Sequence, residues 1–404
     1  MTEPEVRRLV LASSAAMETR ILSGADVLDR LGPRLDELHA TTGVPVTARR
    51  PWLATWVRCQ PAYEPLALCV ESAEHLHGIA LLAQRKQRLF TELVALGAGL
   101  SDQIRLPVRD PEAGRLLTRA VIDRLHEVAG PWRLTIRHLP PGDAVAREIA
   151  AELSCAALET GDASPTLRFD ARRSLRDYVS KNHHQQVRRM RNRMRSAGLD
   201  PRLAHLRDRA AIAAVLPQVV EVCLRRDASL RGESSLDQGS ARAFFREVIL
   251  EHAARGEVEL TTLRLGGELA AYVVCFLDRG AYRMWNCRLA PAWSRYGAGR
   301  VANHAALDHA LADGSATEFD WMRGAEAYKL SLSNHVEHAL DLRAWSSPAL
   351  RSVLDSRRRF KRLVKNAAAE HEWLQPVLDA SRRVKFAGRR GKRAIATALR
   401  RTRG

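Results

Sequence analysis

Two stretches of the chain decide its fold: WNCRLAPAWSRYGAGRVANHAALDHAL, Trp285–Leu311, and EFDWMRGAEAYKLSLSN, Glu318–Asn334. The first predicts a strand, then a short loop that holds Gly297 and Gly299, then a helix. Glycines let a backbone approach an anion closely, and the free N–H groups at the start of a helix point at it. The loop therefore suggests a phosphate site, although such a loop is also a common plain helix cap.

The second stretch gathers titratable side chains at the end of a predicted strand. Asp320 lies at that end, and the turn after it holds Arg323, Glu326, Tyr328 and Lys329. A carboxylate here could act as general base for an amine, a phenol could protonate a leaving group, and a lysine could hold a phosphate. The alternative is that Glu326 and Lys329 form only a surface ion pair, because they have the i, i+3 spacing of one.

Working outward, the same order of elements occurs twice. Residues 26–170 and residues 171–348 each predict helices, antiparallel strands, a further helix and a strand. In the second half, Gly266–Gly267 joins two alternating runs, which is a strong hairpin signal. We therefore expect an α/β chain of two domains with mixed, mostly antiparallel sheets. We expect residues 1–25 to be flexible and residues 349–404 to form a basic helical tail.

Composition excludes several classes of protein. Of the 404 residues, 46% are apolar and 27% are charged, which is typical of a globular chain and not of a disordered one. No apolar run is long enough to span a bilayer, and the N-terminus lacks the apolar core of a signal peptide. The six cysteines form no CxxC pair and show no zinc spacing, so we expect reduced buried thiols and no metal. A cytoplasmic protein is expected, with peripheral attachment to a membrane as an alternative.

Positive charge is concentrated in two segments. The net charge is +18, and residues 349–404 hold 17 basic and 4 acidic residues, a net of +13. Residues 172–195 hold nine basic residues and one acid, Asp177, and their spacing spreads charge around a predicted helix. A basic segment favours an anionic partner such as tRNA or an anionic membrane surface, and a solvated helix or a solubilising tail is the plain alternative.

Together the two stretches resemble the C-terminal half of GNAT-superfamily acyltransferases of the CelD type, which are related to Fem-type peptidyltransferases. The resemblance covers about residues 20–347. It includes Ser174–Leu199, which is similar to a basic helix of that group, and Leu96–Asp102, which is similar to a loop of its first unit. The most specific matches are Trp293, Ser294, Arg295, Tyr296, Gly297, Ala298, Gly299, Phe319, Asp320, Gly324, Glu326, Tyr328 and Lys329.

This resemblance implies two tandem GNAT-like folds, with the active cleft mainly in the second. It implies transfer of an acyl group from acyl-CoA, as co-substrate, to an amine on a small metabolite or sugar precursor, without a metal. The donor would bind on a loop formed by Ser294, Arg295, Tyr296, Gly297, Ala298, Gly299 and Arg300. Asp320 and Glu326 are the candidate bases and Tyr328 the candidate acid. Lys329, Arg323 and Trp285 are the candidate substrate contacts.

Two rival functions stay open at this point. One is an aminoacyl-tRNA-dependent ligase of the Fem type that forms peptide bonds on a similar tandem fold. The other is a non-catalytic RNA- or membrane-binding protein on a degenerate fold. The basic tail favours these two, and the loop Ser294–Arg300 favours the acyl-CoA enzyme.

Overall fold

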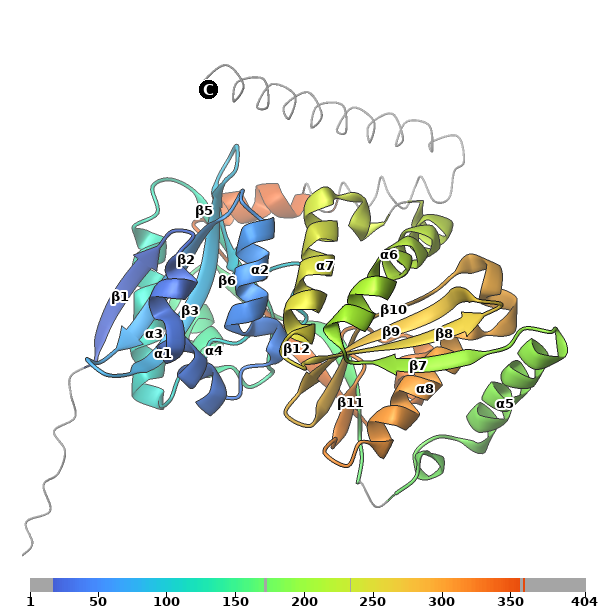
Figure 1. Cartoon of the computed structure of the whole chain (residues 1–404). Helices are drawn as coiled ribbons and strands as arrows, with labels where there is room; N and C mark the ends of the chain where they lie inside the picture. The colour runs from blue at the N-terminus through green and yellow to red at the C-terminus, as the bar shows by residue number, and fades with distance from the viewer. Residues whose placement is uncertain (1–16, 171–172, 233, 357–358, 360–404) are drawn as a thin grey trace, which may run out of the picture. The chain divides into compact units, whose positions relative to one another are not determined.

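The computed structural model describes residues 17–170, 173–232, 234–356 and 359 (Figure 1). The described residues up to Ala344 form one compact unit, and those from Trp345 belong to a second. The predicted basic tail therefore lies mainly outside the described residues. Among the helices that are described, none is long and apolar enough to cross a membrane.

Strands and helices alternate in blocks along the first unit. The strands are β1 (Glu18–Ser23), β2 (Glu64–Glu71), β3 (Leu76–Lys86), β4 (Thr91–Ala95), β5 (Trp132–Leu139), β6 (Ala156–Arg168), β7 (Arg202–Leu206), β8 (Val258–Leu265), β9 (Glu268–Asp278), β10 (Ala281–Leu289), β11 (Glu318–Asp320) and β12 (His335–Trp345). The helices are α1 (Val27–Thr41), α2 (Arg50–Cys59), α3 (Pro111–His126), α4 (Ala144–Glu152), α5 (Lys181–Ser196), α6 (Arg209–Arg231), α7 (Gly239–Ala253), α8 (Ala298–Ala312) and α9 (Ala327–Ser331).

All these strands belong to one twelve-stranded sheet, in the order β1-β2-β3-β4-β5-β12-β6-β11-β10-β9-β8-β7. Each half of the chain gives its last strand to the other half. Strand β6 pairs with β11, and β12 lies between β5 and β6. The two halves are therefore joined through a continuous backbone ladder, and the predicted boundary near residue 170 stays a prediction.

Parallel pairing occurs at matching places in the two halves. Strand β4 runs parallel to β5 with α3 as the crossover, and β10 runs parallel to β11 with α8 as the crossover. The neighbouring pairs, such as β2–β3 and β8–β9, are antiparallel. This confirms the predicted mixed, mostly antiparallel sheet, and it gives the chain two βαβ units that can be compared directly.

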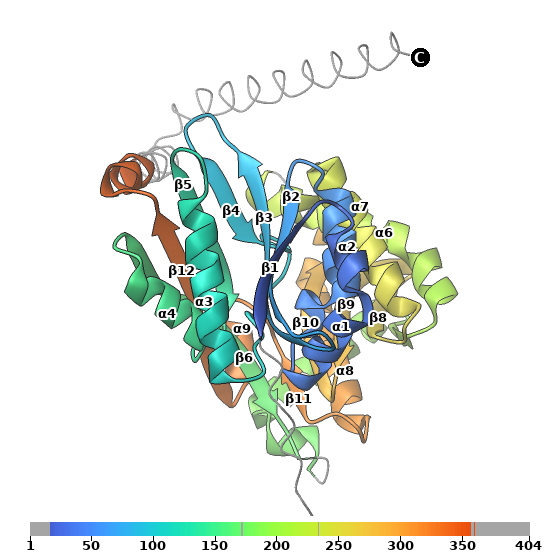
Figure 2. The same cartoon turned by 90° about the vertical axis from the view of Figure 1, so that its left-hand side faces the viewer.

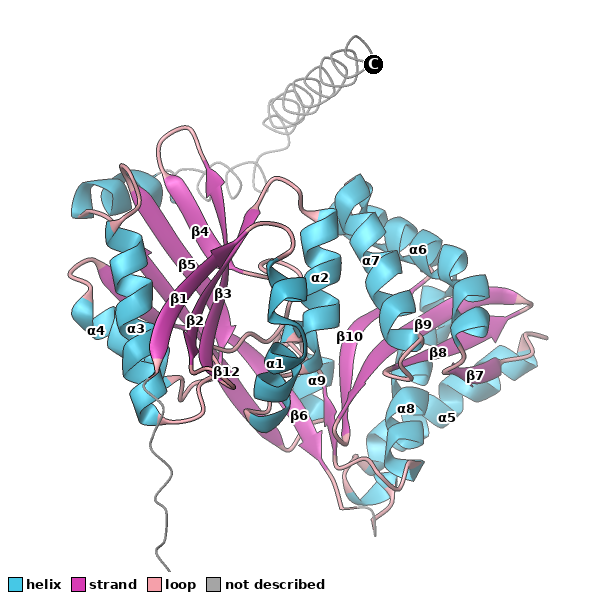
Figure 3. Cartoon of the chain, turned by 60° about the vertical axis from the view of Figure 1, so that its left-hand side comes forward, coloured by secondary structure: helices cyan, strands magenta, loops and turns pink. Residues whose placement is uncertain are grey.

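Helices cover both faces of the sheet (Figures 1 and 3). One face packs against α1, α2, α6 and α7 in a single core that both halves share. In this core the Trp52 ring meets Phe244 edge-on at 5.3 Å and Phe276 at 5.1 Å between ring centroids. On the other face, α3 and α4 cover the first half, and α5 and α8 cover the second. Figure 2 shows α3 with α4 beside it; α3 contacts β2 and β3, and α4 contacts β6.

The prediction that residues 1–25 lack structure is wrong for Glu18–Ser23. These residues form β1, which pairs antiparallel with β2 from Glu18↔Glu71 to Ser23↔Leu66. In this strand Leu22 is buried while its neighbours are exposed. The strand is thus fixed by backbone pairing to an edge, which leaves almost no hydrophobic pattern in the sequence.

Candidate functional site

The first cavity of the site lies where the loop before α8 meets β10, and it has a volume of about 630 Å³. We call it the donor cavity, after the role proposed for it below. It is lined by the start of α5, Arg226 of α6, the end of β10, the first two turns of α8, and α9. The lining residues include Asn182, His183, Gln186, Cys287, Arg288, Leu289, Gly299, Arg300, Asn303 and Tyr328.

The loop before α8 leaves the start of that helix open. A 3-10 turn, Pro291–Tyr296, ends at Gly297, which has a φ of 70° and provides no side-chain cap. A Cβ atom at Gly297 would lie 2.5 Å from the Sδ atom of Met190 on α5, so a larger residue here requires the flexible Met190 side chain to move. The N–H groups of Arg300 and Val301 donate to the Gly297 carbonyl, so the N–H groups of Ala298 and Gly299 are the ones that can receive an anion at the start of α8.

The structure divides the predicted donor loop in two. Gly299 and Arg300 line the donor cavity, and the Arg300 guanidinium contacts the Gln186 side chain. Ser294 and Arg295 are exposed beside the cavity, and the Arg295 guanidinium lies 4.8 Å from the centroid of the Tyr296 ring. Tyr296 and Ala298 are buried in the core, so these two residues shape the loop and do not reach the cavity.

A second cavity, of about 500 Å³, lies beside the first and is here called the acceptor cavity. It brings together five of the predicted site residues: Trp285, Arg323, Glu326, Tyr328 and Lys329. Its wall also includes the loop Gly99–Asp102 from the first half of the chain. The loop predicted by resemblance in the first half therefore reaches the same cavity as the turn in the second half.

The two cavities share Cys287, Arg288 and Tyr328. The Tyr328 hydroxyl lies 3.8 Å from the Cys287 Sγ atom. Burial, and then the neighbouring thiol, raise the pKa of Tyr328 above its usual value, so the phenol keeps its proton at neutral pH. Arg288 is held in place by Asp227, with 2.9 Å between Nε and Oδ1. A protonated phenol thus stands where the contents of the two cavities can meet.

The edge of β10 is open at this junction. Strand β11 pairs with β10 only from Ala281↔Glu318 to Arg283↔Asp320, and a bulge follows between Met284 and Asn286. Strand β10 continues to Leu289, so its last residues leave a free edge beside the cavities. A free strand edge offers backbone N–H and C=O groups to an extended ligand.

Glu326 and Lys329 occupy the acceptor cavity as a pair. The Lys329 ammonium lies 3.2 Å from the Glu326 Oε2 atom and also donates to the Arg323 carbonyl. Lys329 is buried, whereas the Glu326 side chain is 56% exposed and open to the cavity. A Cβ atom at Gly324, whose φ is 120°, would lie 2.2 Å from the Glu326 carboxylate. The glycine therefore makes room for that carboxylate.

Asp320 lies apart from the other two candidate catalytic residues. Its buried carboxylate accepts hydrogen bonds from Arg283 at 2.7 Å, from Gln103 at 2.9 Å and from the Met322 backbone N–H at 2.8 Å. It lines a third cavity, of about 300 Å³, rather than the acceptor cavity. With its oxygens occupied, Asp320 is placed to hold the turn after β11 and not to take a proton from an amine.

Local sequence patterns do not single out His138 and single out Asp102 only weakly, yet both contact Arg323. The Arg323 Nε lies 2.5 Å from the Asp102 Oδ1, and its Nη1 lies 2.7 Å from the His138 Nε2. Burial, and then the Arg323 charge, lower the pKa of His138 to about 4, so its neutral ring accepts this bond. Asp102 could be suspected from its loop. Nothing local marks His138, because its partner is 185 positions away.

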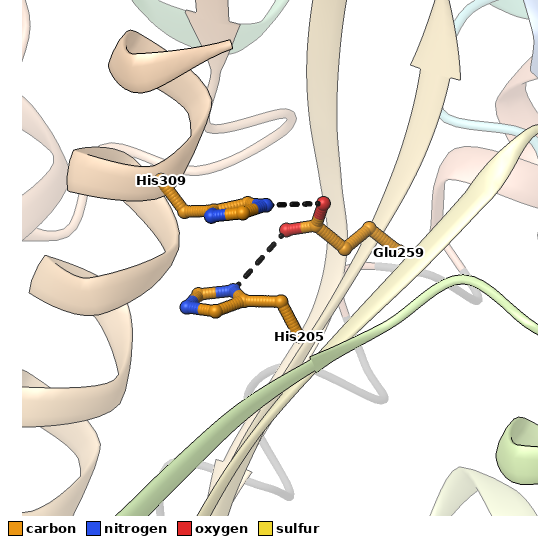
Figure 4. Close-up of side chains that lie close together, drawn as sticks. All are labelled: His205, Glu259 and His309. Atoms are coloured by element: carbon orange, nitrogen blue, oxygen red, sulfur yellow. Dashed lines mark ion pairs between the residues drawn. The ribbon is translucent and has the colours of Figure 1, made fainter.

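A separate titratable cluster lies between β7, β8 and α8 (Figure 4). Ligand atoms of His205, Glu259 and His309 lie within 4.8 Å of one another. The two imidazoles stack with centroids 3.9 Å apart and planes 11° apart, so their in-plane lone pairs cannot converge on one ion without a ring turning. Arg207 already contacts the Glu259 carboxylate at 2.9 Å. The geometry is that of an ion-pair network, and the expectation of no metal stays a prediction.

Residues 181–330 match the family model of the acetyltransferase (GNAT) domain. The second half of the chain contains a GNAT domain. The matched stretch is shorter than half of the chain and includes the loop before α8, the open edge of β10 and the turn that holds Glu326 and Tyr328. No curated protein sequence matches this chain.

Solved structures share the fold around this GNAT domain. FemX has a TM-score of 0.54 and 11% identity, with 76% of this chain and 95% of FemX covered. The C-terminal domain (DUF2156) of a putative lysylphosphatidylglycerol synthetase from Agrobacterium fabrum has a TM-score of 0.51 and 12% identity, with 81% and 94% covered. A tandem GNAT protein from the clavulanic acid biosynthesis pathway has a TM-score of 0.45 and 16% identity, with 82% and 99% covered.

These likenesses, all below 25% identity, concern the fold alone. The predicted fold class, an α/β chain with GNAT-like halves and a mixed, mostly antiparallel sheet, is confirmed. The narrower resemblance to the CelD type stays a prediction, as do the assigned site residues.

Proposed function

We propose that this chain is an N-acyltransferase that moves an acyl group from acyl-CoA in the donor cavity to an amine in the acceptor cavity. One observation carries the proposal: two cavities meet at Cys287, Arg288 and Tyr328, and one of them opens on the uncapped start of α8. A donor with phosphates at one end and an acyl group at the other fits that arrangement. The acceptor is an amine on a small metabolite or sugar precursor.

In this proposal, groups that line the two cavities serve each step of donor binding and acyl transfer. The N–H groups at the start of α8 and Arg300 hold the donor pyrophosphate. The free edge of β10 holds the extended arm of CoA. The amine nitrogen attacks the thioester carbonyl, the new C–N bond forms and the C–S bond breaks. Glu326 accepts the proton that the amine loses, and Tyr328 gives its proton to the leaving thiolate. Lys329 and Arg323 position Glu326 and the turn, and Trp285 forms the apolar wall of the acceptor cavity.

The second candidate is an aminoacyl-tRNA-dependent ligase of the Fem type. The observation that favours it is the arginine-rich helix α5, whose first turn lines the donor cavity. In that case an ester at the end of a tRNA replaces the thioester, and the leaving group is a ribose hydroxyl. The predicted tRNA or membrane contact through residues 349–404 lies mainly outside the described residues.

Thermal unfolding with different donors tests the proposal first. Acetyl-CoA, longer acyl-CoAs and aminoacylated tRNA are compared, because a ligand that binds only the folded chain raises its melting temperature. We expect a rise with at least one acyl-CoA. A rise with aminoacylated tRNA and none with any CoA would move the assignment to the ligase. No response to either donor would contradict both.

Turnover of site variants then tests the roles. With the acyl-CoA that binds, thiol release is measured against a panel of amines. Glu326→Gln should lower turnover about tenfold or more while donor binding stays unchanged. Asp320→Asn is the comparison variant. Because Asp320 holds the turn after β11, this change should lower the stability of the chain, whereas Glu326→Gln should act on the chemical step. Normal turnover in Glu326→Gln would remove Glu326 from the mechanism.

A further inference from the structure

Helix α5 is strongly basic, but none of its lysine or arginine side chains lines the donor cavity. Between residues 181 and 196 it has one lysine and five arginines and no acidic residue. Within the described part of the chain, none of Lys181, Arg188, Arg189 and Arg195 forms an ion pair with a carboxylate. Charges held this close together without counter-charges repel one another, and an anionic ligand relieves that repulsion.

The helix turns different residues to the cavity and to solvent. Asn182, His183 and Gln186 line the donor cavity, and Val187 and Met194 are buried against the core under α8. Successive residues of a helix are about 100° apart, so Lys181, Arg188 and Arg195, at intervals of seven, fall within about 40° of one another. All three are exposed and none lines the donor cavity. Although the arginines as a set are spread around the helix, these three basic residues form one stripe.

The stripe is long enough to contact several phosphates of a nucleic-acid duplex. Lys181 and Arg195 are fourteen residues apart, which is about 21 Å along the helix axis. A nucleic-acid duplex carries one negative charge per roughly 1.7 Å of axis, so about twelve phosphates lie along that length. The described surface of α5 has no exposed large apolar side chain, which a membrane-surface helix would insert between lipids. It also has no Phe, Tyr or Trp on which unpaired bases could stack, and the rings of His183 and His184 are half-buried against His304.

We propose that Lys181, Arg188 and Arg195 form a docking stripe for the phosphate backbone of a double-stranded nucleic acid. Arginine fits this role because its guanidinium pairs with phosphate oxygens in a bidentate way. The contact reads the backbone and not the bases, so RNA and DNA duplexes of one sequence bind with similar affinity. The stripe is separate from the acyl-transfer site and goes beyond the proposed function.

The test compares two triple variants of the full chain by fluorescence anisotropy. In the first, Lys181, Arg188 and Arg195 are changed to Gln. In the control, Arg88, Arg115 and Arg119 are changed to Gln; these arginines are also exposed, and Arg115 and Arg119 lie on α3 at the opposite end of the sheet (Figures 1 and 3). Both variants lose three charges and keep the basic tail. The probes are a short RNA duplex, the matching DNA duplex, and vesicles of phosphatidylglycerol and phosphatidylcholine.

We expect the unchanged chain and the control to bind both duplexes, with affinity falling steeply between about 50 and 200 mM salt. The stripe variant should bind at least about tenfold more weakly. Its slope of log K against log salt should be less steep by about two to three, because each lost phosphate contact removes about 0.9. Equal weakening in both variants, unchanged binding in the stripe variant, or binding to vesicles alone would overturn the proposal.

Stabilisation by acyl-CoA is measured on the same samples to separate this proposal from the proposed function. The stripe variant should keep the full thermal shift with acyl-CoA, because its three residues lie outside the donor cavity. Failure of every CoA to bind would contradict the acyl-CoA assignment and leave the duplex result standing. Loss of the CoA shift in the stripe variant would show that the stripe belongs to the donor site, and would overturn its separate role.

Discussion

The two βαβ units of the chain have the same topology and opposite helix starts. In the first, α3 begins at Pro111, and the Asp110 side chain accepts a hydrogen bond from the Ala113 N–H. A carboxylate therefore already occupies the position where an anion would bind, and Glu112 adds a second negative charge. In the second, α8 begins at Ala298, the preceding Gly297 provides no side-chain cap, and Arg300 lies in the first turn. The same fold thus has one closed and one open anion site.

The strands that lead to these two helices also differ, because only the strand of the second unit has an unpaired edge. Strand β4 ends at Ala95, one residue after its last pair with β5 at Val94. Strand β10 runs on to Leu289, six residues beyond its last pair with β11 at Arg283. The first unit leaves no free edge for an extended ligand, and the second does. The comparison supports the proposal that the second unit binds the donor, and the first unit supplies the loop Gly99–Asp102 to the acceptor cavity.

The largest expected effect comes from placing a negative charge at the open start of α8. Gly297→Asp places a carboxylate beside the open start of α8, where its negative charge repels the donor phosphates. We expect donor affinity to fall about 100-fold, equivalent to ~2.7 kcal/mol. Gly297→Asn is the matched control, because it adds the same bulk against Met190 without the charge and tolerates the same backbone angle. Titration calorimetry with acyl-CoA gives both values, and equal losses would mean that bulk alone is responsible.

The next effect concerns the junction of the two cavities. Tyr328→Phe removes the proton that the leaving group takes up, so turnover should fall about 100-fold with donor affinity unchanged. Since the pKa of Tyr328 is raised, the rate of the unchanged enzyme should not fall at alkaline pH through loss of this proton. Steady-state kinetics across pH checks both points. Turnover within twofold of normal would exclude Tyr328 as the acid.

Acid should destabilise the first half through its buried histidines. Burial lowers the pKa of His39 to about 4, whereas an unfolded histidine titrates near 6.5. Below pH 6.5 the unfolded chain therefore binds more protons, and the stabilisation that is full above that pH is lost as pH falls toward 4. For His39 the loss between pH 7 and pH 5 is about 2 kcal/mol. Urea unfolding at the two pH values should show a smaller difference in His39→Gln than in the unchanged chain.

The smallest expected effect comes from removing the Asp110 cap at the start of α3. Asp110→Ala removes the cap of α3 and should lower the free energy of unfolding by about 1 kcal/mol, whereas Asp110→Asn keeps the cap and should change it little. Neither variant should alter acyl-CoA affinity, because α3 has no free strand edge beside it. A change in CoA affinity in either variant would show that the first unit also takes part in donor binding.

Local sequence was enough to predict the elements that make this contrast. The glycines around Tyr296 and the turn that holds Tyr328 are continuous in the chain, and their residue types show their chemistry directly. The environment of Asp320 could not be predicted, because Gln103 is 217 positions away from it. Only the folded sheet shows that the Asp320 carboxylate is occupied and that Glu326 is open to the acceptor cavity. The stripe on α5 required the observed helix limits, which place Lys181 in line with Arg188 and Arg195.

The stoichiometry of acyl-CoA binding to the full chain tests the contrast between the two units most directly. Titration calorimetry should give one molecule of acyl-CoA per chain, with binding strongly weakened in Gly297→Asp and unchanged in Asp110→Asn. Two molecules per chain, or binding that survives Gly297→Asp at full strength, would contradict the account, because the donor would then not depend on the open start of α8.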